Sequence, residues 1–196
     1  MVTSFDLPNS QEQSYFRMSK IFNILLLWGN NLILIIAFYY QFARHELPCP
    51  ICLLQRVGII LISIGFFLNV NFEIKATHYG VALIGCVLTT IIAMRQVLLH
   101  ITPGDPGYGS SLFGLHFYSL AILSSVVTIV SIAFLLGFYD WEKSRKLNTC
   151  KLVTKSAKSA MIVLSILIFV NLISTFLECG VGKCVSNPIY YQLLKK

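Results

Sequence analysis

Five long apolar runs, separated by short polar segments, follow one another along the chain. The runs cover residues 21–42, 51–70, 79–101, 112–138 and 160–177. Each run is close to or longer than the roughly 18–20 residues that an α-helix, rising about 1.5 Å per residue, needs to cross the hydrocarbon layer of a membrane. A surface helix of a soluble protein carries a polar stripe, whereas the stretch IVLSILIFV in the last run has none. The pattern therefore predicts five transmembrane helices.

The composition supports the same fold class. Of the 196 residues, 56% are hydrophobic and only 12% are charged, which is far from the balance of a soluble domain. We therefore expect an all-α integral membrane protein. The net charge of +7 is explained by basic residues that face anionic lipid, so membrane lipid and no nucleic acid is expected among the partners.

The distribution of lysine and arginine predicts the orientation of the chain. Residues 140–159 hold six of these basic residues, whereas residues 102–111 hold none. By the positive-inside rule, the first segment is a cytoplasmic loop. With five spans, the tail 1–19 is then also cytoplasmic and the tail 179–196 lies outside. Because residues 1–19 lack a basic start and no cleavage pattern follows the first run, we expect a retained helix and no cleaved signal peptide.

The six cysteines sort by the side of the membrane on which they lie. Four share the oxidising outer side as two close pairs, which are Cys49 with Cys52 and Cys179 with Cys184. Cys86 lies inside the third run, where a small buried apolar side chain explains it. Cys150 lies in the cytoplasmic loop and is expected to be a reduced thiol. Only the two outer pairs are therefore candidates for chemistry.

The first outer pair stands in the stretch CPIC at residues 49–52. Pro50 fits the first turn of a helix because the donor that it lacks would be unpaired there, so Cys49 is expected at or near the cap of the second helix. The positive end of the helix dipole there stabilises thiolates, which attack disulfides. A disulfide that closes so small a loop gains little loop-closure entropy, which favours a redox role. For Cys179 and Cys184, a structural bridge remains open.

Arg56 lies one turn further along the second run. Cys49, Cys52 and Arg56 are spaced three and four residues apart, so they form one stripe on a helix, with Arg56 roughly 6 Å below Cys52 toward the membrane. A cation beside a thiolate at the lipid boundary suits a lipid-soluble electron acceptor such as a quinone, whose oxygen gains charge on reduction. The alternative is an arginine that extends to lipid phosphate.

Residues 48–56, PCPICLLQR, resemble the signature of the disulfide bond formation protein B (DsbB) family, and residues 113–118, FGLHFY, are similar to that family's sequence at the start of the fourth helix. The resemblance covers about residues 21–138. It implies a four-helix transmembrane bundle at residues 20–139, to which this chain adds a fifth transmembrane helix at residues 160–178. It also implies a bacterial inner (cytoplasmic) membrane protein, in which the charge pattern above places the amino terminus in the cytoplasm and the carboxy terminus in the periplasm.

The same resemblance implies an enzyme that reoxidises a periplasmic thioredoxin-fold dithiol oxidase (DsbA-like) and passes the electrons to the membrane quinone pool, ubiquinone or menaquinone. Cys52 would contact the quinone, Arg56 would polarise it, and Cys49 would exchange with a second cysteine pair. The family usually places that second pair in the outer loop between the third and fourth helices, but this loop holds no cysteine here. Cys179 and Cys184 are therefore expected to be a relocated shuttle pair.

His100 and His116, near the outer ends of the third and fourth runs, are candidates for lining the quinone pocket or relaying protons, because imidazole titrates near neutrality. Packing at the interface is the alternative for each, and Arg95 is a further candidate. A membrane protein that binds copper or zinc through the CPIC cysteines and a histidine is another open class, although the nearby arginine would repel a cation. A non-catalytic membrane protein with two structural disulfides is the remaining alternative. We expect no metal site.

Overall fold

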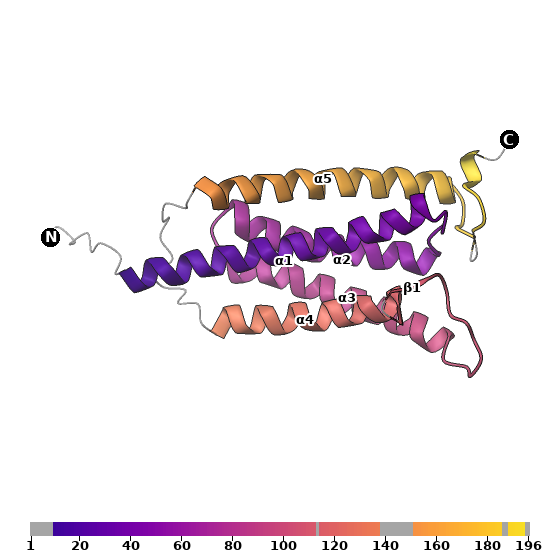
Figure 1. Ribbon diagram of the computed structural model, residues 1–196, viewed down its shortest axis with the longest axis horizontal. Helices are drawn as coiled ribbons and strands as arrows, with labels where there is room; N and C mark the ends of the chain where they lie inside the picture. The colour runs from indigo at the N-terminus through magenta and orange to yellow at the C-terminus, as the bar shows by residue number, and fades with distance from the viewer. Residues whose placement is uncertain (1–9, 113, 138–150, 186–187, 195–196) are drawn as a thin grey trace.

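Five long helices form the molecule. The computed structural model describes residues 10–112, 114–137, 151–185 and 188–194. The helices run side by side (Figure 1) and are α1 (Ser10–Ala43), α2 (Pro50–Asn71), α3 (Ala76–Leu99), α4 (Phe117–Gly137) and α5 (Lys151–Cys179). Each contains a span long and apolar enough to cross a membrane. The predicted all-α, multi-pass membrane fold is therefore confirmed.

Three helix boundaries differ from the apolar runs. The helix predicted from residue 112 begins only at Phe117, because β1 (Ser111–Leu112) and β2 (Leu115–His116) form an antiparallel hairpin there. Gly114 supports the turn with φ of +78°, a conformation that glycine adopts at little cost. At the end of the bundle opposite the cysteine pairs, α1 begins at Ser10 and α5 at Lys151, within segments that were expected to be a tail and a loop. The hydropathy pattern marks only the part of a helix that lies in lipid. Polar residues continue α1 and α5 beyond that part.

Helix α2 lies at the centre of the bundle. It packs against α1, α3 and α5, while α4 packs mainly against α3 and meets α1 through aromatic side chains. Glycines bring α2 and α3 close together: a Cβ atom at Gly85 would lie 2.7 Å from the backbone nitrogen of Ile62, and one at Gly65 would lie 2.7 Å from the Cβ atom of Ala82. Small residues allow such close approach, which drives the association of membrane helices.

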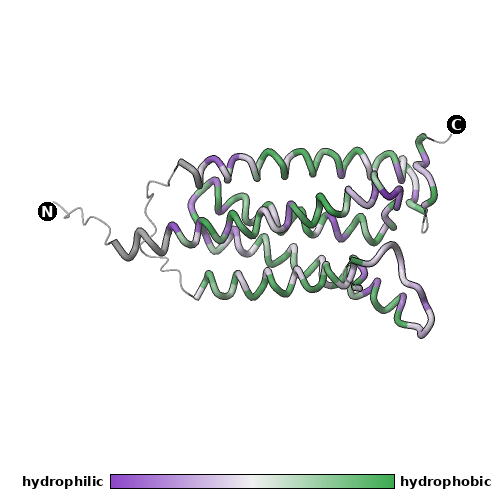
Figure 2. Tube along the Cα trace, in the orientation of Figure 1, coloured by the Kyte–Doolittle hydropathy of each residue, from purple (hydrophilic) through white to green (hydrophobic). Residues whose placement is uncertain are grey.

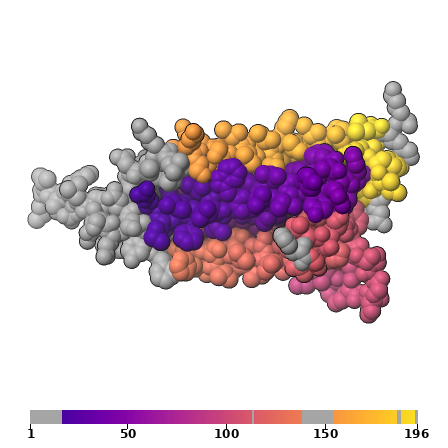
Figure 3. Space-filling model, viewed as in Figure 1, coloured from indigo at the N-terminus to yellow at the C-terminus, as the bar shows by residue number. Residues whose placement is uncertain are grey.

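Hydrophobic residues predominate along the helices of the bundle (Figure 2), and many of them are exposed. Leu25, Ile91, Phe169 and Leu172 are all more than half exposed, which suits contact with lipid tails. In the space-filling view α1 lies between α5 and α4 on one face (Figure 3). The molecule thus presents a lipid-facing belt.

A buried polar network joins α1, α2 and α3 at the end of the bundle opposite the cysteine pairs. Asn23 Nδ2 donates to the Tyr79 hydroxyl at 2.7 Å, and Asn69 Nδ2 donates to Asn23 Oδ1 at 3.3 Å. The Asn69 side chain also accepts the backbone N–H of Lys75 at 3.0 Å and contacts His78 Nδ1 at 3.0 Å. Because these buried groups bind one another, they fix the register of α1, α2 and α3. The opposite end of the bundle, which carries both cysteine pairs and is called the outer end, is organised differently.

Candidate functional site

The pair Cys49 and Cys52 caps the outer end of α2. Cys49 is the N-cap residue, Pro50 occupies the first turn, and the backbone N–H of Cys52 donates to Cys49 Sγ at 3.1 Å. The two residues form a disulfide with 5.0 Å between their Cα atoms. The predicted cap is therefore confirmed. Cys49 is buried and Cys52 is half-buried, so the sulfur of Cys52 is the more accessible of the two.

Gln96, from α3, contacts both sulfurs of this disulfide. Its Nε2 donates to Cys49 Sγ and to Cys52 Sγ, each at 3.5 Å. Gln55 Nε2 donates to Gln96 Oε1 at 2.8 Å and so fixes the orientation of the amide. Both glutamines are buried. Our sequence interpretation missed Gln96, although a glutamine inside an apolar run was a signal, because an amide buried in the membrane needs a partner.

Arg56 points into the bundle and not to the lipid surface. Its side chain is 6% exposed and its guanidinium lies over the Phe38 ring, 4.7 Å from the ring centre. Nη1 donates to Gln41 Oε1 at 2.6 Å and Nη2 to the Ala37 carbonyl at 3.2 Å. The interpretation as an arginine that extends to lipid phosphate does not describe this geometry. The inward position places a buried cation one turn below Cys52, as the helical stripe required.

Gln41 connects this arginine to the carboxy-terminal part of the chain. Its Nε2 donates to the Ser174 hydroxyl on α5 and to the Tyr191 hydroxyl at 3.0 Å, while its Oε1 accepts from Arg56. Gln41 is 2% exposed. A single amide therefore joins α1, α2, α5 and the segment that follows α5. The fifth helix is thus part of the polar site at the outer end of the bundle.

A groove of about 740 Å³ opens between α1 and α4, with α2 behind it. Its outer end is lined by polar side chains and sulfur, which are Cys52, Gln55, Arg56 and Gln96. Its walls below are mostly apolar and follow α1 from Tyr40 to Leu25, about 22 Å at 1.5 Å per residue. Aromatic pairs join α1 to α4 near both ends, with 4.9 Å between the ring centres of Tyr40 and Phe117 and 6.4 Å for Phe22 and Phe134. A polar head with an apolar tail fits this shape.

The loop between α3 and β1 is fastened beside the first cysteine pair. The Glu46 carboxylate accepts from the Ser110 backbone N–H at 3.1 Å and from the Ser110 hydroxyl, and the Tyr108 hydroxyl donates to the Leu47 carbonyl at 2.8 Å. Burial raises the pKa of Tyr108, and the charges of Glu178 and Glu46 raise it further. Tyr108 also lines the groove, so the loop forms part of its outer rim.

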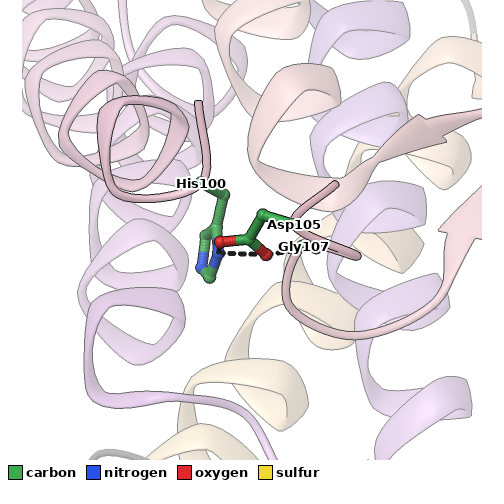
Figure 4. Close-up of polar contacts among 3 residues, drawn as sticks. All are labelled: His100, Asp105 and Gly107. Carbon is green, nitrogen blue, oxygen red and sulfur yellow. Dashed lines mark hydrogen bonds and ion pairs between the residues drawn. The ribbon is translucent and has the colours of Figure 1, made fainter. Parts of the chain in front are cut away.

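His100 and His116 lie beside the groove and do not line it. His100 Nδ1 is 3.2 Å from the carboxylate of Asp105, which also accepts the backbone N–H of Gly107 at 2.8 Å (Figure 4). That N–H and the His100 side chain lower the pKa of Asp105. Both histidine rings stack on Tyr118, with ring centres 6.0 and 5.1 Å away. Tyr118 is the member of this stack that lines the groove.

Gly107 packs closely against His116 in this loop. A Cβ atom at Gly107 would lie 2.7 Å from His116 Nε2, and the residue has φ of +73°, so only glycine fits there. His45, which we did not consider from the sequence, lines the groove. Arg95 is exposed and lies outside the groove lining. The site is thus built mainly from α1, α2 and the loop between α3 and β1, and the predicted histidines do not line it.

The second cysteine pair lies at the end of α5. Cys179 is the last residue of the helix and forms a disulfide with Cys184, with 4.4 Å between the Cα atoms. Cys179 is 5% exposed, whereas Cys184 is half-buried. Cys86 is a buried free cysteine in α3, and Cys150 lies outside the described residues.

The segment after this pair returns to the groove. Gly180, with φ of +60°, turns the chain after α5. Pro188 and Ile189 then line the groove together with Cys52. Within residues 10–112, 114–137, 151–185 and 188–194, no group of three or more histidine, cysteine, aspartate or glutamate side chains is placed to hold a metal ion. The two disulfides, Arg56 and the groove are therefore the chemical features of this end of the molecule.

This fold and site define a helical, multi-pass membrane protein that carries a disulfide at the head of one membrane helix and an apolar groove beside it. Residues 19–109 match the model of the family described as "Disulfide bond formation protein DsbB". The matched segment contains Cys49, Cys52 and Arg56 but not the second cysteine pair.

Two curated proteins of the same name are similar to part of this chain. The Disulfide bond formation protein B of Nitrosococcus oceani is 38% identical over 78 residues, which are 38% of this chain and 46% of that protein. The protein of the same name from Hahella chejuensis is 34% identical over 73 residues, 35% of this chain and 44% of that protein. The chain thus spans less than half the length of these relatives. No solved structure gives a match of comparable strength.

Proposed function

We propose that this protein is a membrane protein-disulfide:quinone oxidoreductase that reoxidises a periplasmic thioredoxin-fold dithiol oxidase. The observation that carries the proposal is the position of the Cys49–Cys52 disulfide. It caps a membrane helix, and its more accessible sulfur lines a groove that also holds a buried arginine and continues between apolar walls. A disulfide that acts only as a staple needs neither the groove nor the cation.

The groove suits a quinone, ubiquinone or menaquinone. Arg56, Gln55 and Gln96 present N–H donors at its outer end, and two of the five guanidinium donors of Arg56 are engaged with protein acceptors. The apolar walls below suit an isoprenoid tail. When bound, a quinone supplies a two-electron acceptor that the amino acids lack. Arg56 would then stabilise negative charge on its oxygen atom.

The two cysteine pairs have distinct parts in this proposal. Cys184 is the more accessible sulfur of the second pair, so we assign it to the attack by the soluble dithiol, with Cys179 as the leaving sulfur. The reduced second pair then attacks Cys49, and Cys52 remains on the groove. The glycines that flank Val181 give the shuttle segment the backbone freedom that this transfer requires.

The arrangement of charge supports the proposed orientation in a bacterial inner membrane. Exposed Lys155 and Lys158 lie near the first turns of α5, and both disulfides lie at the opposite end of the bundle. We therefore assign the lysine end to the cytoplasm and the cysteine pairs to the periplasm, with the bundle at residues 20–139 and the fifth span at residues 160–178.

The test is anaerobic reduction of ubiquinone-1 by the purified full chain, followed optically after addition of a reduced thioredoxin-fold dithiol protein. Wild type is expected to turn over, Cys184→Ser is expected to lose turnover, and Cys86→Ala serves as a cysteine variant outside the site. A wild type that leaves several quinones oxidised refutes the oxidase proposal. A fully active Cys184→Ser variant refutes the shuttle role of the second pair.

A further inference from the structure

Glu178 is a buried acid at the site for which the mechanism above gives no role. It is the residue before Cys179 in α5 and is 2% exposed. Both of its carboxylate oxygens are buried, and neither has a hydrogen-bond partner among the described residues. Burial of a carboxyl group without a partner is costly, and most buried polar groups in native proteins are paired. Such an exception calls for a function.

The surroundings of Glu178 connect the two halves of the site. Glu178 lies one turn along α5 from Ser174, whose hydroxyl accepts from Gln41, and the side chain of Gln41 in turn accepts from Arg56 of α2. The charge of Glu178 also helps to raise the pKa of Tyr108 in the loop after α3. From the carboxy-terminal segment, the Tyr191 hydroxyl accepts from Gln41 of α1, the same side chain that binds Arg56. No ion pair joins Glu178 to Arg56 within the described chain, so the carboxyl group is free to exchange a proton.

The position matters because thiol–disulfide exchange releases protons. When a thiol of the reduced Cys179/Cys184 pair attacks the Cys49–Cys52 disulfide, it first loses its proton; one S–S bond forms between the pairs and the Cys49–Cys52 bond breaks. The second thiol then loses its proton and restores the Cys179–Cys184 disulfide. Two electrons and no protons have moved to the first pair as thiolates, and two protons remain to be placed. Reduction of a quinone to a quinol consumes two.

We propose that Glu178 is the proton-transfer residue of this relay: its carboxylate accepts the proton from the attacking thiol of the second pair and passes it toward the Arg56 end of the groove. The inference rests on the proposed function, because it assigns protons to the exchange between the two pairs. It explains why a buried acid that has no hydrogen-bond partner among the described residues directly precedes Cys179 of the second disulfide. Glu178 acts on one proton at a time, so it serves twice in each turnover.

The test isolates the exchange from quinone reduction. Reduced thioredoxin-fold dithiol protein is mixed with the oxidised full chain without quinone, the reaction is quenched with acid, and alkylation followed by mass spectrometry measures reduction of the Cys49–Cys52 pair. For Glu178→Gln we expect transfer about 100-fold slower at neutral pH, as is usual when a general base is removed. We also expect loss of the wild-type increase in rate with pH that follows ionisation of the carboxyl group.

Two further variants make the outcome decisive. Glu178→Asp keeps an acid on a shorter side chain and should retain a pH-dependent rate with a shifted pH profile, whereas Glu73→Gln changes an exposed acid at the opposite end of the bundle and should behave as wild type. If Glu178→Gln exchanges as fast as wild type with the same pH profile, the inference is overturned. If Glu178→Gln does not fold, the inference is overturned by a Glu178→Asp variant whose pH profile is identical to that of wild type, and supported by one whose profile is shifted.

The same experiment separates this inference from the proposed function. Wild type that reduces its Cys49–Cys52 pair in the quinone-free assay but leaves ubiquinone-1 oxidised contradicts the quinone acceptor and leaves Glu178 to be judged on its own variants. Wild type whose second pair is reduced while the first stays oxidised contradicts both, because the exchange that Glu178 would serve does not occur.

Discussion

Replacement of Gln96 by leucine should lower the reduction potential of the Cys49–Cys52 pair. In the reduced pair, the Gln96 amide donates to sulfur that carries negative charge, so it stabilises the reduced form and raises the potential. A hydrogen bond to a charged group contributes about 1.5–3 kcal/mol, and the 3.5 Å contacts place this one near the lower bound. For a two-electron couple, about 1.4 kcal/mol corresponds to roughly 30 mV, so Gln96→Leu should lower the potential by about that amount.

Gln55→Leu is the matched control. Both substitutions remove the 2.8 Å hydrogen bond between the two glutamines, but only Gln96→Leu removes the donor to sulfur. Each should destabilise the folded protein by about 1–3 kcal/mol, because a buried polar group is left without its partner. Only Gln96→Leu should also shift the potential.

The assay equilibrates the full chain with dithiothreitol buffers of defined potential and counts free thiols by alkylation. It is performed with Cys179 and Cys184 both changed to serine, so that a single pair titrates. An unchanged potential in Gln96→Leu refutes the argument that the amide acts on sulfur. An equal shift in Gln55→Leu refutes it as well, because the effect would then come from the disturbed packing of the two glutamines.

Three further predictions concern stability and the outer loop. Gly85→Val should lower the stability of the protein in detergent by about 1–3 kcal/mol, because the valine side chain would meet the backbone of α2. Gly80→Ala, a control with open space around the position, should change the stability little. Thermal unfolding measures both, and equal effects would contradict the close packing of α2 and α3. Gly107→Ala should increase amide hydrogen exchange in the loop between α3 and β1 more than Gly104→Ala does. Both glycines have positive φ, but only at Gly107 would an added Cβ atom lie within 3.0 Å of a neighbouring ring. Similar effects of the two substitutions would show that backbone strain alone matters. The lowered pKa of Asp105 stabilises the folded loop above the ordinary pKa of an aspartate, and this contribution is lost as pH falls from about 4 through the lowered value. Proteolysis of the loop should therefore increase in acid, and Asp105→Asn should remove that dependence; an unchanged acid response in this variant contradicts the assignment.

The transmembrane helices were predictable because lipid imposes a simple requirement. A segment without water must satisfy its backbone hydrogen bonds internally and carry apolar side chains over a fixed length, and both conditions are visible in sequence. The cap at Cys49 was predictable for a similar local reason, since Pro50 has no donor to lose in the first turn. The hairpin before α4 was missed because Leu112 and Leu115 extend the apolar run of the helix that follows.

The partners of the site residues could not be read from the chain. The helical stripe placed Arg56 one turn below Cys52, but the direction of its guanidinium depends on Gln41 from α1, and that contact joins residues 15 positions apart. The contact of Gln96 with the sulfurs spans more than 40 positions. The two histidines near the helix ends were reasonable candidates by depth, yet the cap after α3 and strand β2 place them against Tyr118 and outside the groove lining.

The sequence by itself determined the five spans, the two cysteine pairs and the chemistry that a thiolate near an arginine makes available, because these depend on residue type and local spacing. Only the tertiary structure decided that α1 and α4 stand apart to leave a groove, that Gln96 lies on the disulfide, and that Glu178 is buried with no hydrogen-bond partner in the described part of the chain. These features depend on how helices rotate and pack against one another, and packing combines many weak contacts between residues distant in the chain.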